Sequence, residues 1–245
     1  MAYATRIRVI DIETTGFDTN ADRIVEIAAY DLCLPDLHIS RVDSIIVNPG
    51  RPIPCEASAV HHLIDVDVAD GIQLPAAWER IVAPADPAFT VFAAHNCDFE
   101  RGFVATPAGI EWICTYKVAL RAWPDAPGHN NQALRYWRGL DSRGERGFDR
   151  QVARLAHRAE PDAYVTAWIL GDLLEQISLE QAIAWSKEPK IFPVLNFGKH
   201  RGAKWADVPA DYLQWLRDGQ HSMDTDWRHG ANVELTRRNQ QAVAQ

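Results

Sequence analysis

The chain has 245 residues, of which 47% are hydrophobic and 24% are charged, and its formal net charge is −8 at pH 7. This size and composition favour one globular domain with a substantial core and room for a small appendage. Proteins that merely coat nucleic acids are usually basic, so the acidic balance argues against that class. It does not exclude an enzyme that gathers carboxylates around metal ions.

The sequence shows no targeting or membrane segment. No basic segment followed by an apolar run opens it, and no apolar stretch is long enough to span a bilayer. Four scattered cysteines without a Cys-x-x-Cys pair predict free thiols and no zinc site: Cys33, Cys55, Cys97 and Cys114. We therefore expect a cytoplasmic protein without a membrane partner.

The hydrophobic pattern predicts strands first and helices later. An apolar run indicates a buried strand over 6–12, and strands over 23–30 and 38–47 follow through short connections, which favours an antiparallel meander. Two more strands are predicted over 90–94 and 112–114. Helices are predicted for a stretch ending at 63 and over 75–81, 116–122, 131–137, 149–157 and 162–177. This order fits an α/β fold, a mixed sheet with helices on both faces.

Two carboxylates mark the end of the first predicted strand. Asp11 and Glu13 are two residues apart, and strand side chains alternate, so both point to the same face. Two like charges held so close repel unless a cation lies between them. A divalent cation is the simplest partner, although a bare Asp-x-Glu is more often a pair of solvated acids.

Two more acidic sites follow at the ends of predicted elements. The segment 94–100 leaves a strand, enters a helix and ends with Glu100. Pro161 favours a first helical turn, which places Asp162 near a helix N-terminus, where the dipole favours an anion. His157 lies just before that helix. Each residue alone could be a surface group, but together they predict a carboxylate-rich metal site with a nearby histidine.

These motifs resemble the DEDD 3′–5′ exonucleases, in the subgroup with a catalytic histidine. The matching motifs are Asp11-Ile12-Glu13-Thr14-Thr15-Gly16, Ala94-His95-Asn96 through Glu100, and His157 through Asp162. Within that family the chain is most similar to a bacterial exodeoxyribonuclease, and the likeness covers nearly the whole chain. It continues through Trp112-Ile113-Cys114-Thr115, Trp123-Pro124, Asn131-Gln132-Ala133-Leu134 and Phe197-Gly198-Lys199-His200-Arg201-Gly202. The resemblance implies a ribonuclease H-like fold.

The resemblance also implies which residues act. Four carboxylates would be both catalytic groups and ligands of two Mg²⁺ or Mn²⁺ ions: Asp11, Glu13, Glu100 and Asp162. Hard divalent cations prefer such oxygen ligands, and a pair of them can activate water and stabilise a leaving oxygen. His157 would be the general base, because imidazole titrates near the working pH.

The terminal nucleotide of the substrate would lie beside the first motif. The residues implied to bind it are Thr14, Thr15, Gly16, Phe17, His61 and His95. Backbone amides and hydroxyls there can hold a nucleotide, and an aromatic ring can stack on a base. Each feature also has a structural interpretation as a plain turn, a core aromatic or a helix-surface histidine.

The sequence departs from the family at one metal position. The family has an aspartate where this chain has Glu100, and Asp98 lies two residues earlier, where the family usually has a small residue. We expect Glu100 to bind metal, with its extra methylene absorbed by the site. The alternative is that Asp98 has taken over this role, although a helix-start or surface acid is the commoner interpretation of that residue.

The predicted domain organisation has three parts. Residues 1–180 form the exonuclease domain, 181–190 a linker and 191–235 a small C-terminal module, followed by a polar tail that we expect to fray. Either the module binds nucleic-acid phosphate or it is only a structural hairpin-and-helix unit. Its candidate phosphate-binding residues are Lys199, His200, Arg201 and Lys204. An arginine-rich segment, 135–158, either steers a phosphate backbone or forms a solvated face.

The expected function is a 3′–5′ exonuclease that acts on single-stranded or frayed 3′ ends of DNA and releases nucleoside monophosphates, in DNA repair or strand degradation. Two alternatives stay open. A 3′–5′ exoribonuclease is one, because discrimination of the 2′-hydroxyl depends on pocket shape. A catalytically silent nucleic-acid-binding module is the other, and the glutamate at position 100 is its best support. The sequence indicates no oligomeric state.

Overall fold

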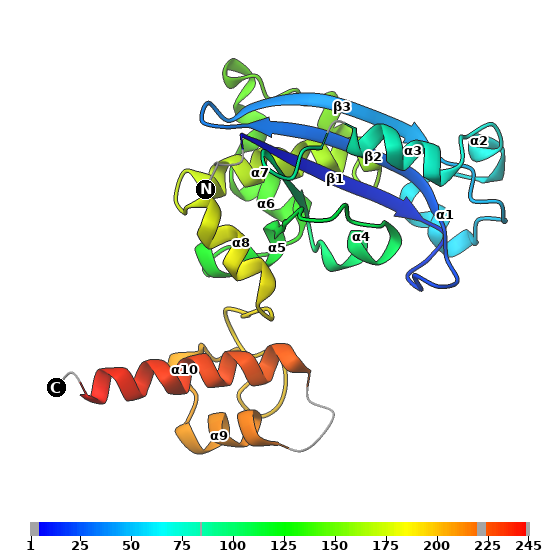
Figure 1. The fold of residues 1–245 in the computed structure, drawn as a ribbon. Coiled ribbons are helices and arrows are strands. Elements are labelled where there is room, and N and C mark those ends of the chain that lie inside the picture. Colours follow the sequence, from blue (N-terminus) through cyan, green and yellow to red (C-terminus); the bar gives the residue numbers. More distant parts are fainter. Residues whose placement is uncertain (1–4, 84, 220–223, 244–245) are drawn as a thin grey trace.

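The computed structural model describes residues 5–83, 85–219 and 224–243 (Figure 1). A five-stranded mixed sheet has the order β3-β2-β1-β4-β5. The central strand β1 (Arg6–Thr14) pairs antiparallel with β2 (Ile24–Cys33), which pairs antiparallel with β3 (His38–Ile46). On its other side β1 runs parallel to β4 (Thr90–Ala94), which runs parallel to β5 (Trp112–Cys114). The predicted meander and all five predicted strands are confirmed.

Strand β1 is central because its apolar residues serve two cores. Ile7 and Val9 belong to one buried cluster, and Ile10 and Ile12 belong to another. Alternation therefore turns every odd-numbered side chain of β1 toward the first cluster, which is the face that α7 (Ala159–Leu174) covers. The acids that follow Val9 at odd positions must face the same helix.

Helices cover both faces of the sheet (Figure 1). With α7, the first face is covered by α5 (Thr115–Ala122), α6 (Asn131–Trp137) and α8 (Leu179–Lys187). The second face is covered by α3 (Leu74–Val82) and α4 (Asp98–Phe103).

Two short helices, α1 (Cys55–His61) and α2 (Asp65–Val68), follow β3. No helix among the described residues is both long and apolar enough to cross a membrane.

The predicted helix over 149–157 is wrong. Only a short 3₁₀ turn, Val152–Arg154, forms there. The Asp149 side chain accepts the Gln151 N–H, and Arg135, from outside the segment, donates to the carbonyl of Ala153, so side chains take backbone bonds that a continuous helix would use.

The next helix, α7, begins three residues earlier than predicted. The carboxylate of Glu26 accepts the Ala159 N–H at 3.0 Å and thereby caps the first turn from a distant strand.

The arginine-rich segment mostly holds the fold together. Asp172, which is 4% exposed, accepts from Arg138 at 2.8 Å and from Arg143 at 2.6 Å. Asp141 accepts from Arg135 at 2.7 Å. These guanidinium groups are already paired inside the protein, so they do not form an open surface for a phosphate backbone.

We propose that the exonuclease domain extends beyond the expected boundary at residue 180. Helix α8 occupies most of the predicted linker and packs against β5 and α5, with Ala182 buried in the main core. Arg121 fixes the chain just beyond α8, since it donates to Glu188 at 3.0 Å and to the carbonyl of Pro189 at 2.8 Å. We therefore propose that the connection between the domains begins after Lys187.

Residues beyond this connection have a hydrophobic cluster of their own, and they lie beside the main body rather than within it (Figure 1). The fully buried residues of this cluster include Leu195, Leu213 and Leu216. Helix α9 (Ala210–Asp218) packs against α10 (Thr225–Val243) around it. A separate core supports the proposal of a distinct C-terminal module.

The prediction of a frayed tail is wrong as far as Val243, because α10 continues to that residue, and residues 244–245 lie outside the described part of the chain. Glu234 accepts from Arg237 and Arg238, each at 2.7 Å, one turn along the helix. Arg238 also donates to the carbonyls of Trp205 and Val208 at 3.0 and 2.8 Å. These contacts tie the polar helix to the rest of the module.

Candidate active site

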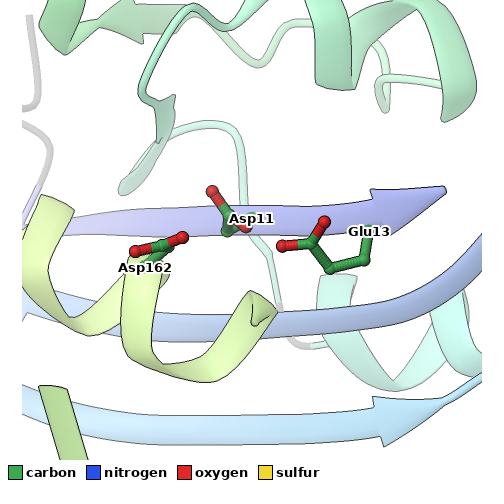
Figure 2. A group of neighbouring side chains, drawn as sticks. All are labelled: Asp11, Glu13 and Asp162. Atoms are coloured by element: carbon green, nitrogen blue, oxygen red, sulfur yellow. The ribbon is translucent and has the colours of Figure 1, made fainter. Parts of the chain in front are cut away.

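Three carboxylates from distant parts of the chain converge on one point (Figure 2). Asp11 and Glu13 project from β1, and Asp162 projects from the first turn of α7. One carboxylate oxygen of each lies within 4.8 Å of those of the other two. Packing of α7 on the odd-numbered face of β1 brings them together. Oxygen ligands at such spacing suit a hard divalent cation.

Asp162 is held in place by its neighbours. Its Oδ2 accepts the backbone N–H of His157 at 2.8 Å, and its Oδ1 accepts from Nε2 of Gln132 at 2.8 Å. Asn131, at the start of α6, donates to the backbone carbonyl of Asp162 at 3.1 Å. Sequence reasoning did not assign Gln132 to the site, although it lies inside one of the quoted motifs.

A charged pair stabilises the other side of the cluster. The guanidinium of Arg158 donates two hydrogen bonds to Glu26, at 2.8 and 2.7 Å. Glu26 is the partner of Glu13 across the β1–β2 ladder, so Arg158 neutralises a charge that would otherwise face Glu13.

Glu100, and not Asp98, reaches the cavity beside these carboxylates. Glu100 on α4 is 3% exposed, lines the cavity of about 440 Å³ and has an Oε2 with no hydrogen-bond partner among the described residues. Asp98 is half exposed and pairs with Lys117 at 2.9 Å and with Arg101 at 3.4 Å. A buried carboxylate oxygen without a partner is costly unless a ligand supplies one.

His157 also lines this cavity and is exposed. Its φ is +60°, a left-handed conformation that is uncommon for residues other than glycine, and its backbone N–H donates to Asp162. No hydrogen bond engages the ring within the described residues. The imidazole therefore stands free at the edge of the carboxylate cluster.

His95 lines the cavity with both ring nitrogens already used. Nδ1 lies 2.9 Å from the hydroxyl of Thr115, and Nε2 lies 2.8 Å from the carbonyl of His129. Since only Nε2 can donate to the carbonyl, Thr115 donates to Nδ1, and burial lowers the pKa of His95 to about 4. The neutral ring has no polar atom left for a substrate, which favours a positioning role over the predicted substrate contact.

The other five residues predicted to bind substrate line one adjoining pocket of about 230 Å³: Thr14, Thr15, Gly16, Phe17 and His61. This pocket shares Glu13 with the carboxylate cavity. Phe17 is 88% exposed and its ring lies 6.1 Å from that of Phe99. The exposed ring is therefore available to a ligand that enters this pocket.

His61 is buried, with 1% exposure, and its Nε2 has no hydrogen-bond partner among the described residues. Its Nδ1 accepts the Leu63 N–H at 3.0 Å, which leaves the proton on Nε2 in the neutral ring. Burial lowers the pKa of His61, although the backbone of Thr14 acts in the opposite direction, and this balance favours the neutral ring with its donor on Nε2.

Hydrogen bonds order the turn that follows the first motif. The Thr15 hydroxyl donates to Asp22 at 2.9 Å, and Asp22 also packs so closely on Gly16 that any side chain there would collide with it. A Cβ at this position would force the hydrogen-bonded carboxylate of Asp22 to move, so glycine is favoured here.

The cluster carries a strong electrostatic penalty. Burial raises the pKa of Asp11 well above its usual range, and the nearby carboxylates of Asp162, Glu13 and Glu100 raise it further. Burial and then Asp162 raise the pKa of Glu13 to about 8. Burial also raises the pKa values of Glu100 and Asp162. A cation bound among them would favour their ionised forms.

These shifts predict how the stability of the metal-free protein depends on pH. The pKa of Glu13 rises from 4.5 to about 8 on folding, so the folded protein binds more protons than the unfolded chain between these values. The free energy of unfolding should therefore fall as the pH rises from 5 to 8, by at most about 1.4 kcal/mol per pH unit for each titrating group. Urea denaturation in EDTA measures this slope.

Glu13→Gln should flatten the slope, whereas Glu180→Gln, at an exposed position on α8, should not. Added Mg²⁺ should stabilise the wild-type protein more at pH 8 than at pH 5, because cations bind ionised carboxylates. Equal stabilisation at both pH values would contradict this account of the cluster.

Comparisons with known proteins agree with this geometry. Residues 9–170 match the RNase T family model, described as Exonuclease. The chain is 34% identical over 227 residues to exodeoxyribonuclease 10 of Escherichia coli K12, across 91% of this chain and 95% of that protein.

A solved structure of exonuclease X in complex with 5′-overhanging duplex DNA matches with a TM-score of 0.58 and 33% identity, over 74% of this chain and 99% of that one. E. coli exonuclease I, solved with an oligonucleotide, shares the fold at 13% identity, with a TM-score of 0.55 over 74% of this chain and 42% of that one. The family resemblance and the ribonuclease H-like mixed sheet flanked by helices are thereby confirmed, and the chain belongs to the exonuclease family.

Proposed function

We propose that this chain is a metal-dependent 3′–5′ exodeoxyribonuclease that shortens DNA from single-stranded or frayed 3′ ends and releases nucleoside monophosphates. The observation that carries the proposal is the convergence of Asp11, Glu13 and Asp162 within 4.8 Å, beside the unpartnered oxygen of Glu100. The similarity to exodeoxyribonuclease 10 across almost the whole chain supports DNA as the substrate.

Two divalent cations, Mg²⁺ or Mn²⁺, would be held by the carboxylates of this cavity. Asp11, Glu13 and Asp162 supply closely spaced oxygens, and Glu100 supplies a buried oxygen that lacks a partner. When bound, the cations would help ionise the attacking water and neutralise charge on the scissile phosphate. The raised pKa values fit this role, since the repulsion among these carboxylates is relieved when they bind either protons or cations.

His157 would act as the general base. Its exposed ring stands at the cavity edge, and the bond from its backbone N–H to Asp162 keeps its segment beside the carboxylates. A free ring nitrogen would take the proton of the attacking water. The positive φ of His157 fits a residue whose position is fixed by function, since such conformations cluster at active sites.

The pocket beside Glu13 would hold the terminal nucleotide. Phe17 offers an exposed ring for stacking on a base, and the buried Nε2 of His61 offers a donor to a sugar oxygen. This pocket adjoins the carboxylate cavity at Glu13, and we infer that a 3′-terminal nucleotide binds there with its 5′ phosphate toward the carboxylates. That orientation accounts for cleavage from the 3′ end.

Digestion of matched single-stranded DNA and RNA oligonucleotides, each labelled at the 5′ end, tests the proposal. In Mg²⁺ the DNA should shorten progressively from its 3′ end, and EDTA should abolish the reaction. Circular single-stranded DNA should stay intact, because it has no end. Faster shortening of RNA than of DNA would instead indicate an exoribonuclease, and no cleavage in Mg²⁺ or Mn²⁺ would support a silent binding module.

The role of Glu100 is tested against that of its neighbour Asp98. Glu100→Gln should lower kcat by at least ~100-fold, because the buried oxygen then loses its charge, whereas Asp98→Asn should retain most of the activity. Calorimetric titration with Mn²⁺ should show weaker metal binding for Glu100→Gln only. The reverse pattern would assign the metal position to Asp98.

Substitution of His157 tests catalysis separately from metal binding. His157→Asn should reduce kcat by roughly 10²–10⁴-fold, since it removes the proton acceptor. Its Mn²⁺ affinity should stay near that of the wild-type protein, because the carboxylates remain. His38→Asn, at an exposed histidine that begins β3, is the matched control and should not change kcat. An unchanged kcat in His157→Asn would remove this residue from the mechanism.

A further inference from the structure

We propose that the C-terminal module carries a second binding site, for single-stranded DNA, made of a basic turn and an aromatic patch on α9. The choice of ligand rests on the proposed function, but the site itself is separate from the carboxylate cavity. It is built on the turn Phe197–Gly202, which sequence reasoning singled out, together with Tyr212 and Trp215, which had no assigned role.

The turn is held firmly at its base. Leu195 is fully buried in the module's core, its N–H donates to the carbonyl of Ala203 at 3.0 Å, and its own carbonyl accepts the Gly202 N–H at 2.7 Å. Gly198 has a φ of +64°, which favours glycine. The backbone therefore presents the side chains between the two glycines on a rigid loop.

Tyr212 joins this turn to α9. Its ring centroid lies 4.6 Å from that of His200 and 5.6 Å from the Nζ of Lys199. Its hydroxyl lies so near Gly198 that any Cβ there would collide with it. The ring of Trp215 follows at 5.2 Å and is 51% exposed. The half-buried ring of Tyr212 thus lies near both the cation of Lys199 and the exposed ring of Trp215.

Two cations of the turn are exposed, and neither forms an ion pair among the described residues: Lys199 and Arg201. Most other cations of the module are paired, such as Arg217 with Asp218 at 2.7 Å and Arg237 with Glu234 at 2.7 Å. In a chain with a net charge of −8, unpaired cations beside an exposed indole favour an anionic partner that also offers a flat ring.

The structure favours two of the four residues of the module that were predicted to bind phosphate. Lys204 lies 3.5 Å from Asp125 of the main domain, and His200 packs on Tyr212 with its Nε2 buried. Lys199 and Arg201 remain as the cations of the turn that form no ion pair among the described residues.

Single-stranded DNA fits this chemistry better than a duplex. Phosphates would meet the two cations, and stacking of an unpaired base on an exposed ring contributes about 1–3 kcal/mol. A base inside a duplex has both faces covered and could not stack on Trp215. A strand held by the module would raise the local concentration of its 3′ end at the nuclease, as a tethered second contact does.

The test measures binding of a 5′-fluorescein oligo(dT) of about 20 nucleotides to the full-length protein by anisotropy, in EDTA so that hydrolysis does not interfere. The double variant Lys199→Glu/Arg201→Glu should weaken binding by at least about tenfold and reduce the salt slope by about 1.4, because two phosphate contacts are lost. Lys187→Glu/Arg80→Glu makes the same charge change at exposed, paired cations elsewhere and should stay within about twofold of wild type.

Trp215→Ala should weaken binding by about fivefold or more without changing the salt slope, and Trp215→Phe should restore most of the affinity. Matched thermal unfolding curves for the two tryptophan variants separate lost stacking from lost folding. The proposal is overturned if both the charge variant and Trp215→Ala bind oligo(dT) within twofold of wild type, or if Trp215→Ala weakens a blunt duplex as much as the single strand. The proposal is also overturned if these variants bind oligo(U) more weakly than the wild type does but bind oligo(dT) with unchanged affinity.

Because binding is measured without metal, this result is independent of nuclease activity. A protein that cuts DNA but binds oligo(dT) equally well in all variants would retain the proposed function and refute this site. If the protein cuts no DNA but these variants bind oligo(dT) more weakly, the proposed function is refuted and the module's binding site is retained.

Discussion

Mutual repulsion among carboxylates is the constraint on which the rest of this structure depends. Asp11, Glu13 and Asp162 are held within 4.8 Å of one another in a partly buried cavity, where neighbouring charge is poorly screened. Such an arrangement opposes folding. Packing and hydrogen bonds elsewhere in the fold must therefore hold the three carboxylates in place against their repulsion.

The fixing elements are a central strand and one helix end. Strand β1 is buried on both faces, and Arg8, 1% exposed, anchors it through two hydrogen bonds to Asp31 and one to the carbonyl of Ile81. The first turn of α7 is secured by Glu26, which caps Ala159. Neither element can retreat from the other without exposing the main core, so the acids stay together although they repel.

Sequence patterns predicted the parts of this site that depend on local periodicity. The two-residue spacing of Asp11 and Glu13 fixes their common face, and the proline near Asp162 indicates a helix start. The role of Gln132 and the capping by Glu26 could not be predicted, since their partners lie 30 and 133 residues away in the chain. Such contacts are set by tertiary packing and leave no local periodicity.

The buried oxygen of Glu100 and the buried nitrogen of His61 have a consequence for how this chain changes over generations. Each is a polar atom that the described part of the folded protein leaves without a partner. An apolar replacement of similar shape would remove that cost, so drift toward stability alone would erase both groups. A chain that keeps them is expected to be under selection for a bound ligand. Loss of that selection would first become visible as hydrophobic substitutions at these two positions.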